Sequence, residues 1–361
     1  MTRSTAFYIN GGAGRVICSI PAFVKYAEEN PDDDFIIVCE GGMDFYKGHP
    51  VLHKRAYDHW HKNLFEDYIK DRVCVTPEPY RVWEYYNQQC SLAQAFDIAI
   101  SNKGVRELSD TKIYLNKAEI AQAYNIVQEV KAGTGFDKVL VVQPFGRTNE
   151  NTGDLIIDST SRSFHLNDIV KIINELKKEY AVIIMSETPI SLEEKDNNKY
   201  PVAIPQIPDP RVWAAVLEIA DHFLGCDSLG QHIIKALGKT ATVVMGSTFP
   251  INVSYPNDGN FDIIDMGKDS RVYSPIRLTM EDQQDRLNDE IMEMSDTDIA
   301  TVINSVKARL GKSEKFTGKY VPPQQSGEVC PVHGVVHKNP VTHDQPTAPA
   351  LVLGKTGKPN I

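Results

Sequence analysis

The chain of 361 residues has no long apolar run and few cysteines. No window approaches the roughly 20 apolar residues of a membrane-spanning helix, and the apolar run near the N-terminus is too short for a signal peptide. The six cysteines are scattered without CxxC pairs, a pattern typical of small core residues rather than of a disulfide framework or a zinc site. We therefore expect a cytoplasmic protein that touches a membrane at most peripherally.

Positive charge is also in deficit. Lys and Arg total 38 against 48 Asp and Glu, which gives a formal net charge of -10. Overall electrostatics therefore argue against a protein that coats nucleic acid, although a local basic patch can still hold an anionic ligand. With 42% hydrophobic residues, the chain is long enough for two packed domains. This composition favours a globular protein that acts on small molecules.

The stretch 220–250 carries the clearest pattern in the chain. A short apolar run begins at residue 222, a helix is predicted over 231–237, and a second apolar run covers 241–245. This order of strand, helix and strand is the βαβ unit of a parallel sheet.

Polar turns follow both strands of this unit. Asp227 and Ser228 come after the first strand as good helix N-caps, and Gly246 to Thr248 follow the second strand. Ligands bind at the carboxyl ends of strands in open α/β sheets, and unpaired amides at a helix N-terminus suit a phosphate. The sequence thus predicts a pyrophosphate site, with an ordinary capped turn that binds nothing as the alternative.

The segment LGCDSLGQHIIKALGKTATVVMGSTFP resembles the donor-site segment of the ADP-heptose:lipopolysaccharide heptosyltransferases, glycosyltransferase family nine. Leu229 departs from the family pattern, in which glycine directly follows the serine. The resemblance implies an α/β protein of the GT-B type, with two Rossmann-like domains whose parallel sheets face across a cleft. The matching residues are Gly225, Asp227, Ser228, Gly230, His232, Ala236, Leu237, Gly238, Gly246, Thr248 and Pro250.

The opening of the chain resembles the same family. A β-prone run is followed by the glycine-rich turn Gly11 to Gly14 and then by apolar residues at helical spacing. Taken alone, such a turn more often only permits close strand–helix packing. The resemblance implies that Gly12 and Gly14 contact the acceptor.

The residue after this turn departs from the family. An aspartate that takes the proton from the acceptor hydroxyl is usual there, but this chain has Arg15, and an arginine cannot act as a general base at neutral pH. Glu40 and Asp44 are the candidate replacements, although a solvated strand end also explains Glu40. Arg15 would then hold an anionic group of the substrate, or the chain would not catalyse.

The window 46–70 is the most basic and aromatic part of the chain. Lys47, His49, Lys54 and Arg55 are its candidate acceptor-binding residues, since such a patch binds phosphates and stacks on rings. The expected acceptor is anionic. It is either the lipopolysaccharide core, in which case the protein would act at the inner membrane, or modified bases of viral DNA. A solvated loop and helix explain the window nearly as well.

A second series of strands starts near residue 138. Its first strand ends in Pro144, Phe145 and Gly146, a turn comparable to the one that opens the second half of the heptosyltransferases. Arg162 takes the place of a family lysine that steadies the leaving diphosphate, with an exposed surface arginine as the alternative. The resemblance implies donor contacts from Gly146, Arg162 and His232.

We therefore expect an acceptor-binding domain over residues 1–133, a donor domain over 134–311 and a Pro/His-rich tail over 312–361. The final helix of the donor domain would cross back to the first domain. The expected function is transfer of a sugar from a nucleotide-diphosphate sugar to an acceptor hydroxyl, without metal or cofactor. The alternatives are a glycosyltransferase of modified DNA bases, an inactive relative that binds nucleotide sugars, and a sugar-nucleotide epimerase.

Overall fold

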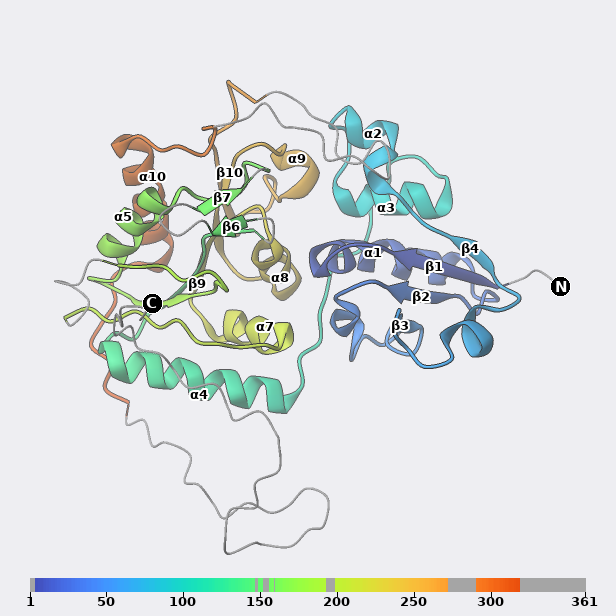
Figure 1. Cartoon of the computed structure of the whole chain (residues 1–361), viewed down its shortest axis with the longest axis horizontal. Coiled ribbons are helices and arrows are strands. Elements are labelled where there is room, and N and C mark those ends of the chain that lie inside the picture. The colour runs from blue at the N-terminus through green and yellow to red at the C-terminus, as the bar shows by residue number, and fades with distance from the viewer. Residues whose placement is uncertain are drawn as a thin grey trace, which may run out of the picture.

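The computed structural model describes residues 4–146, 149–151, 156–158, 160–192, 199–271 and 290–318. Two parallel sheets organise these residues (Figure 1). The first sheet has the order β3-β2-β1-β4, and all of its pairings are parallel. Its strands are β1 (Thr5–Ile9), β2 (Ile36–Cys39), β3 (Ala56–Asp58) and β4 (Val73–Val75).

The second sheet has the order β11-β10-β9-β5-β8 and is also parallel. β5, β8, β9 and β10 are buried along their whole length, as expected for strands covered on both faces. β6 (Asn149–Asn151) pairs with β7 (Ile156–Asp158) in the antiparallel direction. The strands of the sheet are β5 (Val139–Gln143), β8 (Ala181–Ile184), β9 (His222–Cys226), β10 (Ala241–Met245) and β11 (Phe261–Asp265).

Helices connect the parallel strands, and several begin with local capping signals. Ser91, Asn116 and Ser295 each form a reciprocal capping box, which satisfies amides that a helix start leaves unpaired. The longer helices are α1 (Ala13–Glu29), α3 (Leu92–Ser101), α4 (Lys117–Thr134), α5 (Leu166–Leu176), α7 (Pro210–Ile219), α8 (Leu229–Leu237) and α10 (Asp296–Leu310). The short ones are η1 (Met43–Tyr46), η2 (Phe65–Ile69), η3 (Pro79–Arg81), α2 (Trp83–Tyr86) and α9 (Pro250–Val253).

The two sheets define a first and a second lobe, each with its own helices (Figure 1). α4 packs against α7 and β8 of the second lobe, although the sequence analysis places it before the boundary at 133. α10 packs against α5, β9 and β10, so the last described helix stays with the second lobe rather than crossing back. Residues 319–361 of the expected tail lie outside the described residues.

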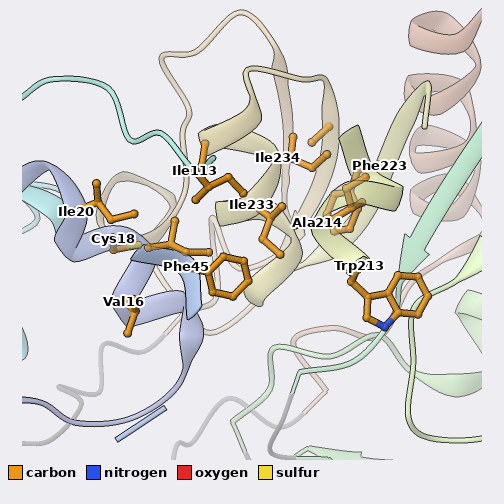
Figure 2. Packing of buried hydrophobic residues seen from close by; sticks show 14 of the residues in the cluster. Val16, Cys18, Ile20, Phe45, Ile113, Trp213, Ala214, Phe223, Ile233 and Ile234 are labelled. Atoms are coloured by element: carbon orange, nitrogen blue, oxygen red, sulfur yellow. The ribbon is translucent and has the colours of Figure 1, made fainter. Parts of the chain in front are cut away.

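One hydrophobic core runs through both lobes. Val16 and Cys18 of α1 belong to the same buried cluster as Ile233 and Ile234 of α8 (Figure 2). The helix that follows β1 therefore packs directly on the helix that follows β9. Among the described residues, no helix combines the length and the apolar character needed to cross a bilayer.

Candidate active site

The glycine-rich turn of the first lobe meets α8 of the second lobe. A Cβ atom added to Gly14 would lie 3.2 Å from Cδ2 of His232, so a side chain here would press on this imidazole. The Nδ1 atom of His232 lies 3.4 Å from Sγ of Cys18 and 2.8 Å from the Tyr255 hydroxyl. Burial lowers the pKa of His232 to about 4, so the ring is neutral at pH 7. His232 thus joins the lobes as a hydrogen-bonding group.

Asp227 stands at the end of β9 and is buried at this junction. Its Oδ1 atom accepts a hydrogen bond of 2.8 Å from the Gln231 amide group, and its Oδ2 atom accepts one of 2.8 Å from the Thr248 hydroxyl. Nη1 of Arg162 lies 3.8 Å from Oδ2, within ion-pair range. The structure therefore brings together Arg162, Asp227 and Thr248, which the sequence analysis assigned to the donor.

A polar turn holds Arg162 in place. The Asp158 carboxylate accepts hydrogen bonds from Thr160 and Ser163, and the Thr160 hydroxyl in turn accepts one of 2.9 Å from Nε of Arg162. The Arg162 side chain is 25% exposed, unlike its buried partner Asp227. Burial opposes the charge, but the Asp227 and Asp158 carboxylates outweigh it and raise the pKa of Arg162. A permanent cation is thus left partly accessible.

The turn before α8 differs from the expected cradle of unpaired amides. The Gly230 amide donates a 2.8 Å hydrogen bond to Oε1 of Gln143, and Nε2 of Gln143 donates to the Ser228 hydroxyl at 3.2 Å. A Cβ at Gly230 would lie 2.4 Å from the Phe223 ring, so close packing requires this glycine. The prediction of an unpaired amide was therefore wrong at Gly230, because a neighbouring strand supplies its acceptor.

Two further glycines assigned to the donor are packed by protein groups. The Gly146 amide donates to the Ser163 hydroxyl at 2.9 Å. A Cβ at Gly246 would lie 2.4 Å from the Ser161 carbonyl oxygen. Both glycines therefore shape the turns that carry Arg162 and Thr248, and their contact with a donor stays a prediction.

Arg15 is buried and turned toward the segment after β4. Its Nη2 atom lies 3.3 Å from Oε1 of Glu78, and its guanidinium lies 5.0 Å from the Tyr80 ring centre and 5.6 Å from that of Phe96. Nε and Nη1 have no hydrogen-bond partner among the described residues. Sequence reasoning missed Glu78, because nothing local to the segment indicates that it reaches Arg15.

The two carboxylates proposed as the base have other partners. Oε2 of Glu40 accepts a 2.5 Å hydrogen bond from the Gly11 amide and so closes the glycine-rich turn. Asp44 forms an ion pair of 2.5 Å with Lys47, one turn further along the chain. Neither carboxylate contacts Arg15 in the described interactions. Catalysis by either one stays a prediction.

The basic residues of the first lobe do not form one patch. Arg55 donates a 2.9 Å hydrogen bond to the Phe35 carbonyl oxygen, just before β2 begins, and so lies at the end of the sheet opposite the Gly12 turn. Nδ1 of His49 accepts from the amides of Val51 and Leu52, and burial lowers the pKa of this ring. Lys54 is exposed. Arg55 and His49 therefore have structural partners, and acceptor binding by this set stays a prediction.

A cavity of about 1120 Å³ lies beside the end of α8. It is lined by the segment from Asp110 to Leu115, by the end of α8 and by the loop from Ser254 to Asn260. None of the site residues predicted from the sequence lines it. Nowhere in the described ranges do three or more His, Cys, Asp or Glu side chains gather as a set of metal ligands.

Two lobes with parallel sheets, meeting where their strands end, define the GT-B class of fold. The chain is similar to the glycosyl transferase family 9 structure from Veillonella parvula, with a TM-score of 0.56 and 12% identity, over 85% of this chain and 97% of that one. It is also similar to E. coli ADP-heptose lps heptosyltransferase II, with a TM-score of 0.50 and 9% identity, over 84% and 98%. The expected GT-B fold is therefore confirmed. No protein-family model and no curated protein sequence matches the chain.

Proposed function

We propose that this protein is a glycosyltransferase that moves a sugar from a nucleoside diphosphate sugar to a hydroxyl group. The observation that carries this proposal is the cluster of Arg162, Asp227 and Thr248 at the carboxyl end of the second sheet, at its junction with the first lobe. In open α/β sheets this is where ligands bind. The GT-B fold supports the same class of reaction by analogy.

Arg162 is the group that would stabilise the leaving diphosphate. Negative charge develops on the diphosphate oxygen as the bond to the sugar breaks, and a fixed cation favours that charge most in a site with little water. The Gly230 amide is hydrogen-bonded to Gln143 and is therefore not available to the diphosphate. More of the stabilisation of the leaving group then depends on Arg162. Asp227 limits the motion of the guanidinium and holds Thr248.

The substrates follow from the resemblance rather than from a bound group. A heptose-type donor and an anionic acceptor are the proposed classes, without a metal or other cofactor. The acceptor hydroxyl would approach from the turn of Gly12 and Gly14, since Gly14 lies against His232 of α8. Catalysis with modified DNA as acceptor would show as binding to DNA with a steep salt dependence.

Binding of ADP, GDP, UDP and their heptose, glucose and mannose conjugates, measured by calorimetry with EDTA present, tests the donor site. Arg162→Ala removes a charged hydrogen-bond donor worth about 1.5–3 kcal/mol, so the affinity should fall about 10- to 150-fold. Arg309→Ala is the matched control: Arg309 is 29% exposed and also pairs with an aspartate, Asp262, near the start of β11. Its affinity should match that of the unaltered protein.

Two results would contradict the proposal. One is that no nucleoside diphosphate or sugar conjugate binds the unaltered protein. The other is that Arg162→Ala and Arg309→Ala bind equally well. Binding without any cleavage of the sugar conjugates would instead indicate a nucleotide-sugar-binding protein that does not catalyse.

A further inference from the structure

Transfer of a sugar to a hydroxyl requires a group that takes the hydroxyl proton. Arg15 cannot serve, because a guanidinium stays protonated in proteins. Glu40 is hydrogen-bonded to the Gly11 amide and Asp44 is paired with Lys47. One further carboxylate touches the first turn of α1, that of Glu78.

We propose that Glu78 is the general base of the transfer reaction and that Arg15 is the residue that positions it. This inference rests on the proposed glycosyltransferase function. Glu78 lies three positions beyond the end of β4, the strand that pairs with β1. Because β4 and β1 run parallel, the residues after both strands lie at the same end of the sheet.

The geometry around Glu78 suits a base. Its side chain is 15% exposed, so it is largely withdrawn from water and still accessible at one side. Oε1 lies 3.3 Å from Nη2 of Arg15, whereas Oε2 has no hydrogen-bond partner within the described part of the chain. One oxygen is therefore oriented by a fixed cation, and the other is available for a substrate hydroxyl.

Arg15 is well placed to hold this carboxylate still. The rings of Tyr80 and Phe96 lie against its guanidinium, and the side chain is 7% exposed. A cation held between aromatic faces loses rotational freedom before any substrate arrives. Arg15 thus acts through Glu78 and does not itself exchange a proton.

The segment that carries Glu78 also borders the second lobe. Asn252 of α9 donates hydrogen bonds to the carbonyl oxygens of Tyr85 at 3.1 Å and Cys90 at 2.9 Å. Tyr80 is among the groups whose electrostatic influence reaches Arg162. The proposed base and the cation for the leaving group therefore belong to the two walls of one junction.

The acceptor oxygen forms a bond to the anomeric carbon as its proton passes to Oε2 of Glu78. The bond from that carbon to the diphosphate oxygen breaks, and its electron pair leaves with the diphosphate beside Arg162. Glu78 then releases the proton to water.

Cleavage of the sugar conjugates with water as the acceptor tests Glu78 directly, with release of nucleoside diphosphate as the readout. Water must lose a proton to react, whereas azide is already an anion and needs no base. Glu78→Gln should lower cleavage by water by about 10²- to 10⁴-fold, with azide restoring cleavage and yielding the glycosyl azide. Glu78→Asp should keep part of the activity, and Glu28→Gln, at an exposed carboxylate near the other end of α1, should behave as the unaltered protein.

Arg15→Met tests the positioning role. We expect a lower kcat with little change in the KM for the sugar conjugate, together with recovery in azide, because azide bypasses the misplaced carboxylate. Loss that azide does not restore would mean that Arg15 only supports the fold. That result would overturn its assignment.

The outcomes separate this inference from the proposed function. Cleavage by Glu78→Gln at the unaltered rate, or a loss that azide leaves in place, would overturn Glu78 as the base while leaving the glycosyltransferase intact. Failure of the unaltered protein to bind any sugar conjugate would overturn the proposed function, and this inference with it. Binding without cleavage by water or azide would overturn both the transferase function and the base, and would leave a nucleotide-sugar-binding protein.

Discussion

Arg211 of α7 pairs with a buried carboxylate of the second lobe and also bonds to the backbone of the first lobe. Its Nε and Nη2 atoms lie 2.6 and 2.9 Å from the two oxygens of Glu119 on α4. Nη1 donates to the Asp44 carbonyl oxygen in the first lobe at 2.9 Å, and Nη2 donates to that of Tyr114 at 2.5 Å. Replacing Arg211 with Met keeps much of the apolar stem but removes every one of these hydrogen bonds.

The magnitude follows from burial. Exposed ion pairs contribute about 0–1 kcal/mol to the free energy of unfolding, but removing one partner of a buried pair costs about 3–5 kcal/mol because the other charge is left unpaired. Arg211 is 3% exposed and Glu119 is 11% exposed in this pair. Arg211→Met should therefore lower the free energy of unfolding by about 3–5 kcal/mol.

Urea denaturation at pH 7, followed by circular dichroism, measures this loss, and a double-mutant cycle with Glu119→Gln separates the pair from its surroundings. The double variant should be more stable than the sum of the single losses predicts, because no uncompensated carboxylate remains. A loss below about 1 kcal/mol, the range of an exposed pair, would refute the reasoning. So would strictly additive losses.

The same pair has a pH signature. Burial opposes ionisation, but the hydrogen bonds from Arg211 and from the Asn116 amide lower the pKa of Glu119 below 4.5 in the folded protein. A depressed carboxyl pKa contributes stability above the unfolded pKa, and this contribution is lost as the pH falls through the folded value. The difference between Arg211→Met and the unaltered protein should thus shrink below about pH 4.5.

Two further predictions concern the second lobe. Burial lowers the pKa of His222 from 6.5 to about 4, so its neutral form contributes stability above pH 6.5 that is lost toward pH 4; urea midpoints should fall across this range, and less steeply in His222→Gln. Gly230→Ala would place a Cβ 2.4 Å from the Phe223 ring and should lower the melting temperature, whereas Gly259→Ala, with nothing within 4 Å, should not. Equal melting temperatures for the two alanine variants would contradict this prediction and show that the Phe223 ring moves aside at little cost in stability.

Local signals in the sequence predicted much of the second lobe. The apolar run 241–245 coincides with β10, and the helix predicted over 231–237 lies within α8, because a buried parallel strand and an amphipathic helix each leave their own pattern in the chain. The fold class followed from the order of these elements and from the family resemblance. The meeting of Asp227 and Thr248 followed from the rule that parallel strands end at one edge, whereas Arg162 was assigned to the same site through the family resemblance.

In the second lobe, the sequence by itself determined which segments become the main strands and helices, and which polar residues stand at strand ends, because these properties depend on neighbours within a few positions. Tertiary structure alone decided that the Gln143 side chain accepts a hydrogen bond from the Gly230 amide. It also decided that Arg15 lies against Glu78, 63 residues further along the chain. Both contacts depend on which strands lie side by side: β5 beside β9, and β4 beside β1. Strand order is a result of packing the whole sheet, and no short stretch of sequence records it.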